Sequence, residues 1–270
     1  MYRWIVLFVC IVCMLASLRC RRPTIREGFL NADDKIASAS LEEHGYAIVP
    51  SFLDEKTTDT LRDLIFDTME NEELTLGDID TTNDRRYDVL LPVTADTRKV
   101  MRTVYKRLRG LFDAYDTNPW LAEHSCFLNF PYSDPQRWHR DIEEPIGRMI
   151  TVGVALEDIT EEMGPLEVLP GSHKNPRDMR QRTCIEEMKD LCGYFNDVAK
   201  DRVPCLCSRG SLIIWDNTLV HRSAANKSDR LRSIFYFTLL CGSDKIPKGS
   251  TQSILPEFKN IRISDIMGKT

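Results

Sequence analysis

Apolar positions change their spacing along the chain near residue 120. Before that point, apolar residues recur every three to four positions, which predicts amphipathic helices, one after the candidate N-cap Asp54 and another from Asp96. A shorter helix that ends at Gly45 leads into a predicted strand at 46–50. The first part of the chain is therefore expected to be mainly helical.

After residue 120 the apolar runs become short and are separated by glycine and proline, which is typical of a β-sandwich or barrel. The predicted strands are 125–131, 135–141, 149–156, 166–169, 210–216 and 231–241. The pattern as a whole predicts a mainly β fold with flanking helices.

Two polar stretches interrupt these elements. Residues 71–90 are acidic and rich in turn formers, which predicts a loop whose Arg85 and Arg86 are solvated charges or, alternatively, reach a carboxylate substrate. Residues 174–209 are charged and partly helical. They are expected to leave the sheet, either as a lid over a site or as surface decoration.

The N-terminus carries an uncharged apolar run, residues 4–18, with arginines on both sides. A helix of this length covers about 22 Å, less than the ~30 Å hydrocarbon core, so a span needs neighbouring residues and snorkelling arginines. The run predicts a transmembrane anchor within 1–22, a tether at 23–36 and one domain at 37–270. The heavier positive charge on its C-terminal flank favours a cytosolic domain. A cleaved signal peptide, which leads to the secretory pathway, is the main alternative.

Composition places the chain among ordinary globular proteins, with 42% hydrophobic and 29% charged residues. The formal net charge of −5 and the lack of a basic stripe argue against nucleic acid as a partner. At 270 residues the chain is long enough for one large β-rich domain. The nine cysteines lack metal or redox spacing, and we expect them to be free thiols in a reducing compartment.

His139 and Asp141 form a His-x-Asp pair within the predicted strand 135–141. Side chains two residues apart on a strand share one face, at about 7 Å between Cα atoms, so both can bind one metal ion. His221 is the best candidate for a third ligand from a distant strand. Two histidines and one carboxylate leave positions open on the ion, which is the arrangement of non-haem Fe(II) oxygenases.

Arg232 begins the apolar strand 231–241. An arginine in such a strand needs solvent or an anion, because burying its charge alone is costly. A dicarboxylate cosubstrate would satisfy the guanidinium through a bidentate pair. Ser223 lies two residues beyond His221 and is expected on the same face of its strand.

The segments QRWHRD, EEMGPLEVLPGSHK and GSLIIWDNTLVHRSAANKSDRLRSIFYF resemble the phytanoyl-CoA dioxygenase family. The opening LEEHGYAIVPSFLDEKTTDTLR is similar to the helix-strand-helix at the start of that family, so the resemblance covers about residues 40–245. It implies a double-stranded β-helix, a cupin-like jelly roll, with Fe(II), 2-oxoglutarate and O2, and ascorbate as a further candidate. By the same resemblance, His139, Asp141 and His221 are the iron ligands.

The resemblance also implies cosubstrate contacts. Arg232 matches the arginine that binds the far carboxylate of 2-oxoglutarate, and Ser223 matches a residue that hydrogen-bonds the same molecule. Asn129 matches a further contact with the cosubstrate. Gly153 is a departure, because some members have an aromatic residue there, and this departure bears on the packing around 2-oxoglutarate.

The activity implied by the family is hydroxylation of an unactivated C–H bond in a small organic or lipid-like substrate, with release of succinate and CO2. The carboxylate of Asp141 favours hydroxylation over halogenation, since halogenating relatives have a small residue at that position. The alternative is a jelly-roll protein that binds another metal, or binds ligands without oxygenase activity. The sequence indicates neither the substrate nor the oligomeric state.

Overall fold

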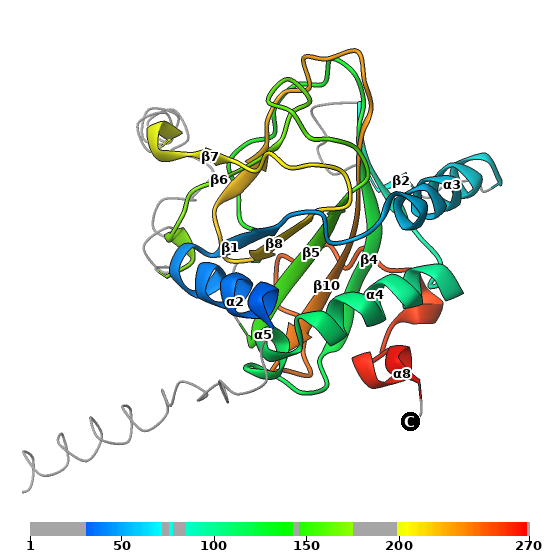
Figure 1. The fold of residues 1–270 in the computed structure, drawn as a ribbon, viewed down its shortest axis with the longest axis vertical. Coiled ribbons are helices and arrows are strands. Elements are labelled where there is room, and N and C mark those ends of the chain that lie inside the picture. Colours follow the sequence, from blue (N-terminus) through cyan, green and yellow to red (C-terminus); the bar gives the residue numbers. More distant parts are fainter. Residues whose placement is uncertain (1–30, 72–75, 78–84, 143–145, 175–198, 269–270) are drawn as a thin grey trace, which may run out of the picture.

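The structure is a computed structural model, and it describes residues 31–71, 76–77, 85–142, 146–174 and 199–268 (Figure 1). Its α-helices are α2 (Ala32–His44), α3 (Glu55–Asn71), α4 (Ala95–Arg107), α5 (Arg109–Asp113) and α8 (Ile263–Met267). Its strands are β1 (Tyr46–Val49), β2 (Leu76–Gly77), β3 (Arg86–Leu90), β4 (Trp120–Asn129), β5 (Arg148–Ala155), β6 (Leu166–Val168), β7 (Val203–Pro204), β8 (Leu212–Asp216), β9 (His221–Ser223) and β10 (Arg232–Cys241). Short 3₁₀ turns are η2 (Ser172–Lys174), η4 (Ala199–Asp201) and η5 (Pro256–Phe258).

The strands form two antiparallel sheets. The larger sheet has the order β1-β8-β5-β10-β4-β3-β2, and the smaller sheet has the order β7-β6-β9. The chain passes from one sheet to the other and back, since β5 and β8 lie in the larger sheet and β6 and β9 in the smaller one. This arrangement is a double-stranded β-helix, so the mainly β fold expected from the sequence is confirmed.

Alternation along the strands gives the larger sheet two different faces. On β10, Phe235, Phe237 and Leu239 belong to the main hydrophobic cluster, whereas Ile234 belongs to a second cluster. Side chains at every second position of a strand point to the same face. The larger sheet is therefore covered by helices on one face and turned toward the smaller sheet on the other.

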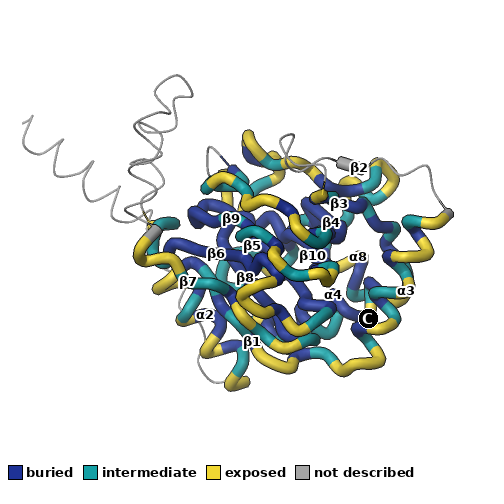
Figure 2. Tube along the Cα trace, turned by 90° about the horizontal axis from the view of Figure 1, so that it is seen from above, coloured by how far each residue is buried: buried dark blue, intermediate teal, exposed yellow. Residues whose placement is uncertain are grey.

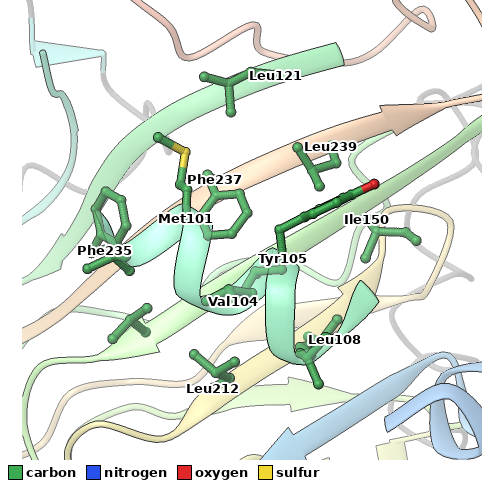
Figure 3. Packing of buried hydrophobic residues seen from close by; sticks show 14 of the residues in the cluster. Met101, Val104, Tyr105, Leu108, Leu121, Ile150, Leu212, Phe235, Phe237 and Leu239 are labelled. Atoms are coloured by element: carbon green, nitrogen blue, oxygen red, sulfur yellow. The ribbon is translucent and has the colours of Figure 1, made fainter. Parts of the chain in front are cut away.

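The helices pack through a continuous apolar surface. Figure 3 shows Met101, Val104 and Tyr105 of α4, and Leu108 directly after it, in one cluster with the sheet residues Phe235 and Phe237. Leu41 of α2 joins the same cluster and is fully buried. The strands form the buried centre of the molecule (Figure 2), so the helical layer supports the sheet from one side.

Helix α2 is capped at both ends. The Asn31 side chain accepts a hydrogen bond from the Asp34 amide, and Gly45 closes the helix in the left-handed region at φ 82°. A Cβ atom at Gly45 would lie 2.5 Å from Nδ1 of His173, so glycine is required there for space as well as conformation. Helix α2 begins at Ala32, and the last residues of the expected tether 23–36 therefore belong to the folded domain.

Most of the predicted elements are present. The expected strands at 46–50, 125–131, 149–156, 166–169, 210–216 and 231–241 are confirmed as β1, β4, β5, β6, β8 and β10. The helix expected after Asp54 is confirmed, and the Asp54 carboxylate accepts the amide hydrogen of Thr57 at 2.7 Å.

Two predictions of secondary structure are wrong in part. The predicted strand 135–141 forms only an isolated bridge, at His139, which exchanges two backbone hydrogen bonds with His221. The Gln136 amide also donates to the Ser223 carbonyl, but Pro135 has no amide hydrogen to donate. The predicted loop 71–90 ends in strand β3, which pairs with β4 over its whole length. Residues 175–198 of the expected excursion 174–209 lie outside the described residues.

The expected membrane attachment requires correction. Among the residues that the structure describes, no helix has the length and apolar character needed to cross a membrane. The run 4–18 on which the expectation was based, together with the rest of 1–22, lies outside the described residues. The membrane-anchored localisation and the transmembrane character expected from the sequence are therefore wrong by this criterion.

Candidate metal centre and cosubstrate pocket

A cavity of about 180 Å³ is lined by residues of both sheets. Its wall contains ligand-type, cationic and acidic side chains together. The lining includes Arg86, Asp88, Glu123, His139, Asp141, Trp215, His221, Ser223, Arg232, Tyr236 and Thr251.

His139, Asp141 and His221 meet at the wall of this cavity. Each residue offers one potential ligand atom, and these atoms all lie within 4.8 Å of one another. Oδ1 of Asp141 lies 3.6 Å from Nε2 of His139 and 3.3 Å from Nε2 of His221. The backbone explains the convergence, because His139 pairs directly with His221, the first residue of β9.

Both imidazole rings are oriented by the backbone of their own segment. Nδ1 of His139 lies 2.8 Å from the Arg137 carbonyl oxygen, and Nδ1 of His221 lies 3.0 Å from the Leu219 carbonyl oxygen. A carbonyl oxygen can only accept, so each Nδ1 is the protonated nitrogen. Each Nε2 faces Asp141 and is the ring nitrogen that remains for a metal ion.

The carboxylate of Asp141 is also held in place. The indole Nε1 of Trp215 donates to Oδ2 at 3.3 Å, which leaves Oδ1 for the side facing the histidines. Burial alone would raise the pKa of Asp141, but the His221 imidazole and then His139 bring this pKa below its usual value. The donor set therefore fits a divalent ion such as Fe(II), with two neutral imidazoles and one anionic oxygen.

Arg232 lies in the same cavity with its side chain buried. It is 2% exposed; Nη2 donates to Ser223 Oγ at 3.2 Å, Nη1 donates to the Gly164 carbonyl, and Nε has no partner. No carboxylate among the described residues forms an ion pair with Arg232. Burial, followed by the charge of Arg86, lowers the pKa of Arg232 to about 9. A buried guanidinium with an unused donor fits an anionic ligand.

Asn129, the third expected cosubstrate contact, lies opposite Arg232 in the register of β4 and β10. The side chain is buried, its oxygen accepts from the Ser133 hydroxyl, and its Nδ2 has no partner. The residue is not part of the cavity wall. A contact with the cosubstrate stays a prediction for this residue.

Packing explains why position 153 is a glycine, which the sequence alone did not reveal. A Cβ atom at this position would lie 2.9 Å from Cγ2 of Ile234 and 3.3 Å from the ring of Trp215. Trp215 comes from β8, next to β5, and it is the residue that orients Asp141. The space beside Gly153 is therefore filled by an aromatic ring from the neighbouring strand.

Sequence reasoning missed three charged residues of the cavity. Arg86 was expected to be a solvated charge or, alternatively, to reach a carboxylate substrate. It is 3% exposed and lines the wall, so the solvated alternative is wrong. Asp88 and Glu123 are also buried there. The alternation of Arg86 and Asp88 with Tyr87 and Val89 was a possible signal for a strand with one polar face, but the acidic context obscured it.

Asp88 and Glu123 are surrounded by hydroxyl groups. Asp88 accepts hydrogen bonds from Ser125, Tyr236 and Ser253. Glu123 accepts from Thr238 at 2.6 Å and from two hydroxyls after β10. Burial raises the pKa of Glu123 to about 7, and the charges of Asp141 and Asp88 act in the same direction.

The raised pKa of Glu123 predicts a pH dependence of stability. The folded protein holds this proton more tightly than the unfolded chain, whose glutamate has a pKa of 4.5. The contribution of the protonated Glu123 to the stability of the fold is therefore complete below pH 4.5, and it is lost as the pH rises to about 7. We expect the free energy of unfolding of the parent, relative to Glu123→Gln, to fall by up to about 3 kcal/mol between pH 5 and 8.

Urea unfolding at the two pH values measures this difference. Glu257→Gln is the matched control, because Glu257 is exposed and the substitution removes the same charge. A parallel pH dependence of the parent and Glu123→Gln would contradict the prediction.

Comparison with known proteins places the chain in a family. The family model for phytanoyl-CoA dioxygenase (PhyH) matches residues 41–234. The chain belongs to this family. The phytanoyl-CoA dioxygenase family consists of Fe(II)- and 2-oxoglutarate-dependent oxygenases, and the His-Asp-His donor set agrees with it. The family prediction and the cofactor prediction, Fe(II) with 2-oxoglutarate, are confirmed.

Named relatives within the family match over a limited stretch. Phytanoyl-CoA dioxygenase domain-containing protein 1 of Danio rerio is 36% identical over 101 residues, which cover 36% of this chain and 35% of that protein. The Caenorhabditis elegans homolog of phytanoyl-CoA dioxygenase domain-containing protein 1 is 28% identical over 134 residues, which cover 46% of this chain and 44% of that homolog. The matched stretch is thus less than half of each relative.

Solved structures share the fold over most of the chain. The non-haem α-ketoglutarate-dependent carbocyclase SnoK from nogalamycin biosynthesis is 21% identical with a TM-score of 0.64, and the match covers 85% of this chain and 90% of that one. The epimerase SnoN in complex with Fe3+, α-ketoglutarate and nogalamycin RO is 17% identical with a TM-score of 0.60, covering 82% and 92%. At these identities the likeness establishes the double-stranded β-helix.

Proposed function

We propose that this protein is an Fe(II)- and 2-oxoglutarate-dependent dioxygenase that hydroxylates an unactivated C–H bond of a small organic substrate, with release of succinate and CO2. One observation carries the proposal. The cluster of His139, Asp141 and His221 shares a cavity with the buried Arg232, which forms no ion pair with a described carboxylate. Family membership supports the same reading.

In this proposal His139, Asp141 and His221 hold the iron. The bound ion, with 2-oxoglutarate and O2, supplies the oxidising power for cleavage of a C–H bond. The chain contributes two imidazoles oriented through Nδ1 and a carboxylate oriented by Trp215. These hydrogen bonds prepare the three donors before any ion arrives.

Arg232 and Ser223 receive the far carboxylate of 2-oxoglutarate in this proposal. The guanidinium offers an unused Nε, and the Ser223 hydroxyl already contacts Nη2. The amide of Asn129 is the third proposed contact, since its Nδ2 is buried without a partner. Charge-assisted bonds of this kind orient a diacid strongly, because both charges are removed from water together.

The presence of Asp141 as a carboxylate favours hydroxylation over halogenation. An aspartate oxygen fills the ligand position that a halide would need. Structural neighbours include a carbocyclase and an epimerase, so the outcome of the reaction is the finer part of the proposal. Mass spectrometry of the product distinguishes a gain of one oxygen atom from ring formation or inversion.

The test is release of succinate from 2-oxoglutarate by the purified full chain with Fe(II), measured across a panel of small metabolites. We expect one or more compounds to stimulate turnover above the uncoupled level, and a chelator to abolish it. A chain that binds Fe(II) or another divalent ion but never releases succinate would instead be a metal-binding jelly-roll protein without oxygenase activity.

A further inference from the structure

Glu123 lines a part of the cavity that lies far from Arg232. On β10, Thr238 is the register partner of Glu123 and follows Arg232 by six residues, which is about 20 Å along a strand. The charge of Asp141 is among the causes that raise the pKa of Glu123, so this carboxyl group lies within range of the metal cluster. The position is therefore separate from the one proposed for the far carboxylate of 2-oxoglutarate.

The side chain of Glu123 has room for one further hydrogen bond. Its Oε2 accepts from the Thr238 hydroxyl at 2.6 Å, and its Oε1 accepts from the hydroxyls of Ser250 and Thr251, both at 3.1 Å. An ionised carboxylate has about four acceptor sites, so the described residues leave one site on Oε2 unused. Because Glu123 lines the cavity, a ligand in the cavity is the group that can use this site.

Asp88 adds a second buried carboxyl group to the same wall. Both of its oxygens are already occupied, by the hydroxyls of Ser125, Tyr236 and Ser253. Within the described ranges, neither Asp88 nor Glu123 forms an ion pair with a lysine, arginine or histidine. Burial of two carboxylates without a cation is costly, and a cation in the cavity would remove much of that cost.

The cavity is a ligand site on independent grounds. It contains the His-Asp-His cluster and also the guanidinium of Arg232, which is buried and has an Nε without a partner. The acidic wall itself does not resemble a second metal site, because the group of potential metal ligands found among the described residues is the His-Asp-His cluster. An organic cation with N–H donors suits a wall of carboxylate and hydroxyl oxygens better.

We propose that Glu123 is a specificity-determining residue that binds a protonated amine of the substrate, with Asp88 adding negative charge beside it. The inference rests on the function proposed above, and it names the substrate class as a small organic amine. A purely structural role of Glu123 would consist of holding Ser250 and Thr251, which follow β10, against the sheet. Such a role would not distinguish an amine from a neutral molecule of the same shape.

Pairs of matched probes test this distinction. Each pair consists of a short aliphatic amine and the alcohol with the same carbon skeleton. The full chain is loaded with Mn(II) and 2-oxoglutarate without O2 at about pH 8, where Glu123 is largely ionised and the amines are still protonated. Broadening of the NMR signals of a probe by Mn(II) measures its affinity for sites near the metal. We expect the amines to bind at least about tenfold more tightly than their alcohols.

Two variants assign the preference to the acidic wall. Glu123→Gln removes the charge with little change of shape, and it should reduce the advantage of the amines by about tenfold. The affinities for the alcohols and for 2-oxoglutarate should stay within about threefold of the parent. Asp88→Asn should reduce the same advantage by a smaller factor, because the oxygens of Asp88 are already occupied. Glu257→Gln is the matched control, since Glu257 is exposed.

Several results would overturn the inference: equal affinities of amines and alcohols in the parent, no binding of any amine, an unchanged advantage in Glu123→Gln, or equal losses for both kinds of probe. If Glu123→Gln fails to fold, the comparison of amines with alcohols in the parent and in Asp88→Asn decides. Isothermal titration with 2-oxoglutarate precedes the probes. A parent chain that binds no 2-oxoglutarate would refute the proposed function itself, whereas a parent that binds it without preferring amines would refute only the substrate class.

Discussion

Replacement of His221 by alanine is expected to abolish 2-oxoglutarate turnover and to weaken metal binding by more than 100-fold. The imidazole is buried in the cavity wall, and its Nε2 lies 3.3 Å from Oδ1 of Asp141. Loss of groups that only orient a ligand typically costs 10- to 100-fold in metal affinity, so loss of a ligand itself should cost more. Titration with Co(II), followed by its visible absorption, measures the binding, and succinate release measures the turnover.

His44→Ala is the control for this substitution. His44 is exposed at the end of α2 and lies outside the His139-Asp141-His221 cluster. The control should keep parental metal affinity and turnover. Parental activity in His221→Ala would show that the iron is held elsewhere, and the proposed site would then be wrong. His139→Ala provides an independent second test of the same cluster.

Arg232→Gln is expected to raise the KM for 2-oxoglutarate by about 100-fold without loss of folding stability. The substitution removes a buried charge that forms no ion pair with a described carboxylate, and isolated buried charges oppose folding. The binding loss follows from the charge-assisted bonds that the guanidinium would form with the far carboxylate. The unusual combination of intact stability and lost affinity identifies a binding residue rather than a structural one.

Thermal unfolding with and without 2-oxoglutarate measures both effects in one experiment. A ligand that binds the folded state raises the unfolding temperature, so the parent should shift upward and Arg232→Gln should not. Arg230→Gln is the matched control, since Arg230 is exposed two residues earlier and donates to the Met163 sulfur. An equal upward shift in the parent and in Arg232→Gln would contradict the assignment.

Local sequence patterns predicted the sheet well because its strands are nearly continuous apolar runs. β8 and β10 are buried at every position. An apolar run of this kind, bounded by glycine or proline residues, fits few secondary structures other than a buried strand. The segment around His139 was harder, because its shape depends on backbone hydrogen bonds to the segment around His221, which lies 82 residues later. The prediction of a strand was wrong there, although the side chains of His139 and Asp141 do converge.

The polar side of the cavity could not be read from the sequence. Asp88 is satisfied by hydroxyl groups from three separate segments, and one of them, Ser253, lies 165 residues away. The local alternation around Asp88 does not show that its carboxylate is buried among hydroxyl groups of such distant segments. Arg86 illustrates the same limit, since its burial follows from the pairing of β3 with β4 and from carbonyl groups of Asp134 and Ala224.

The way in which the two histidines are held has a consequence for maturation of the protein. Each ring is secured by a carbonyl two residues earlier in its own segment, at Arg137 and at Leu219. The rings therefore need no ion to find their orientation, and the polypeptide can complete folding first and acquire its iron afterwards. The fraction of competent molecules in a cell should then follow the local supply of the ion, and chelated protein should recover when the ion is returned.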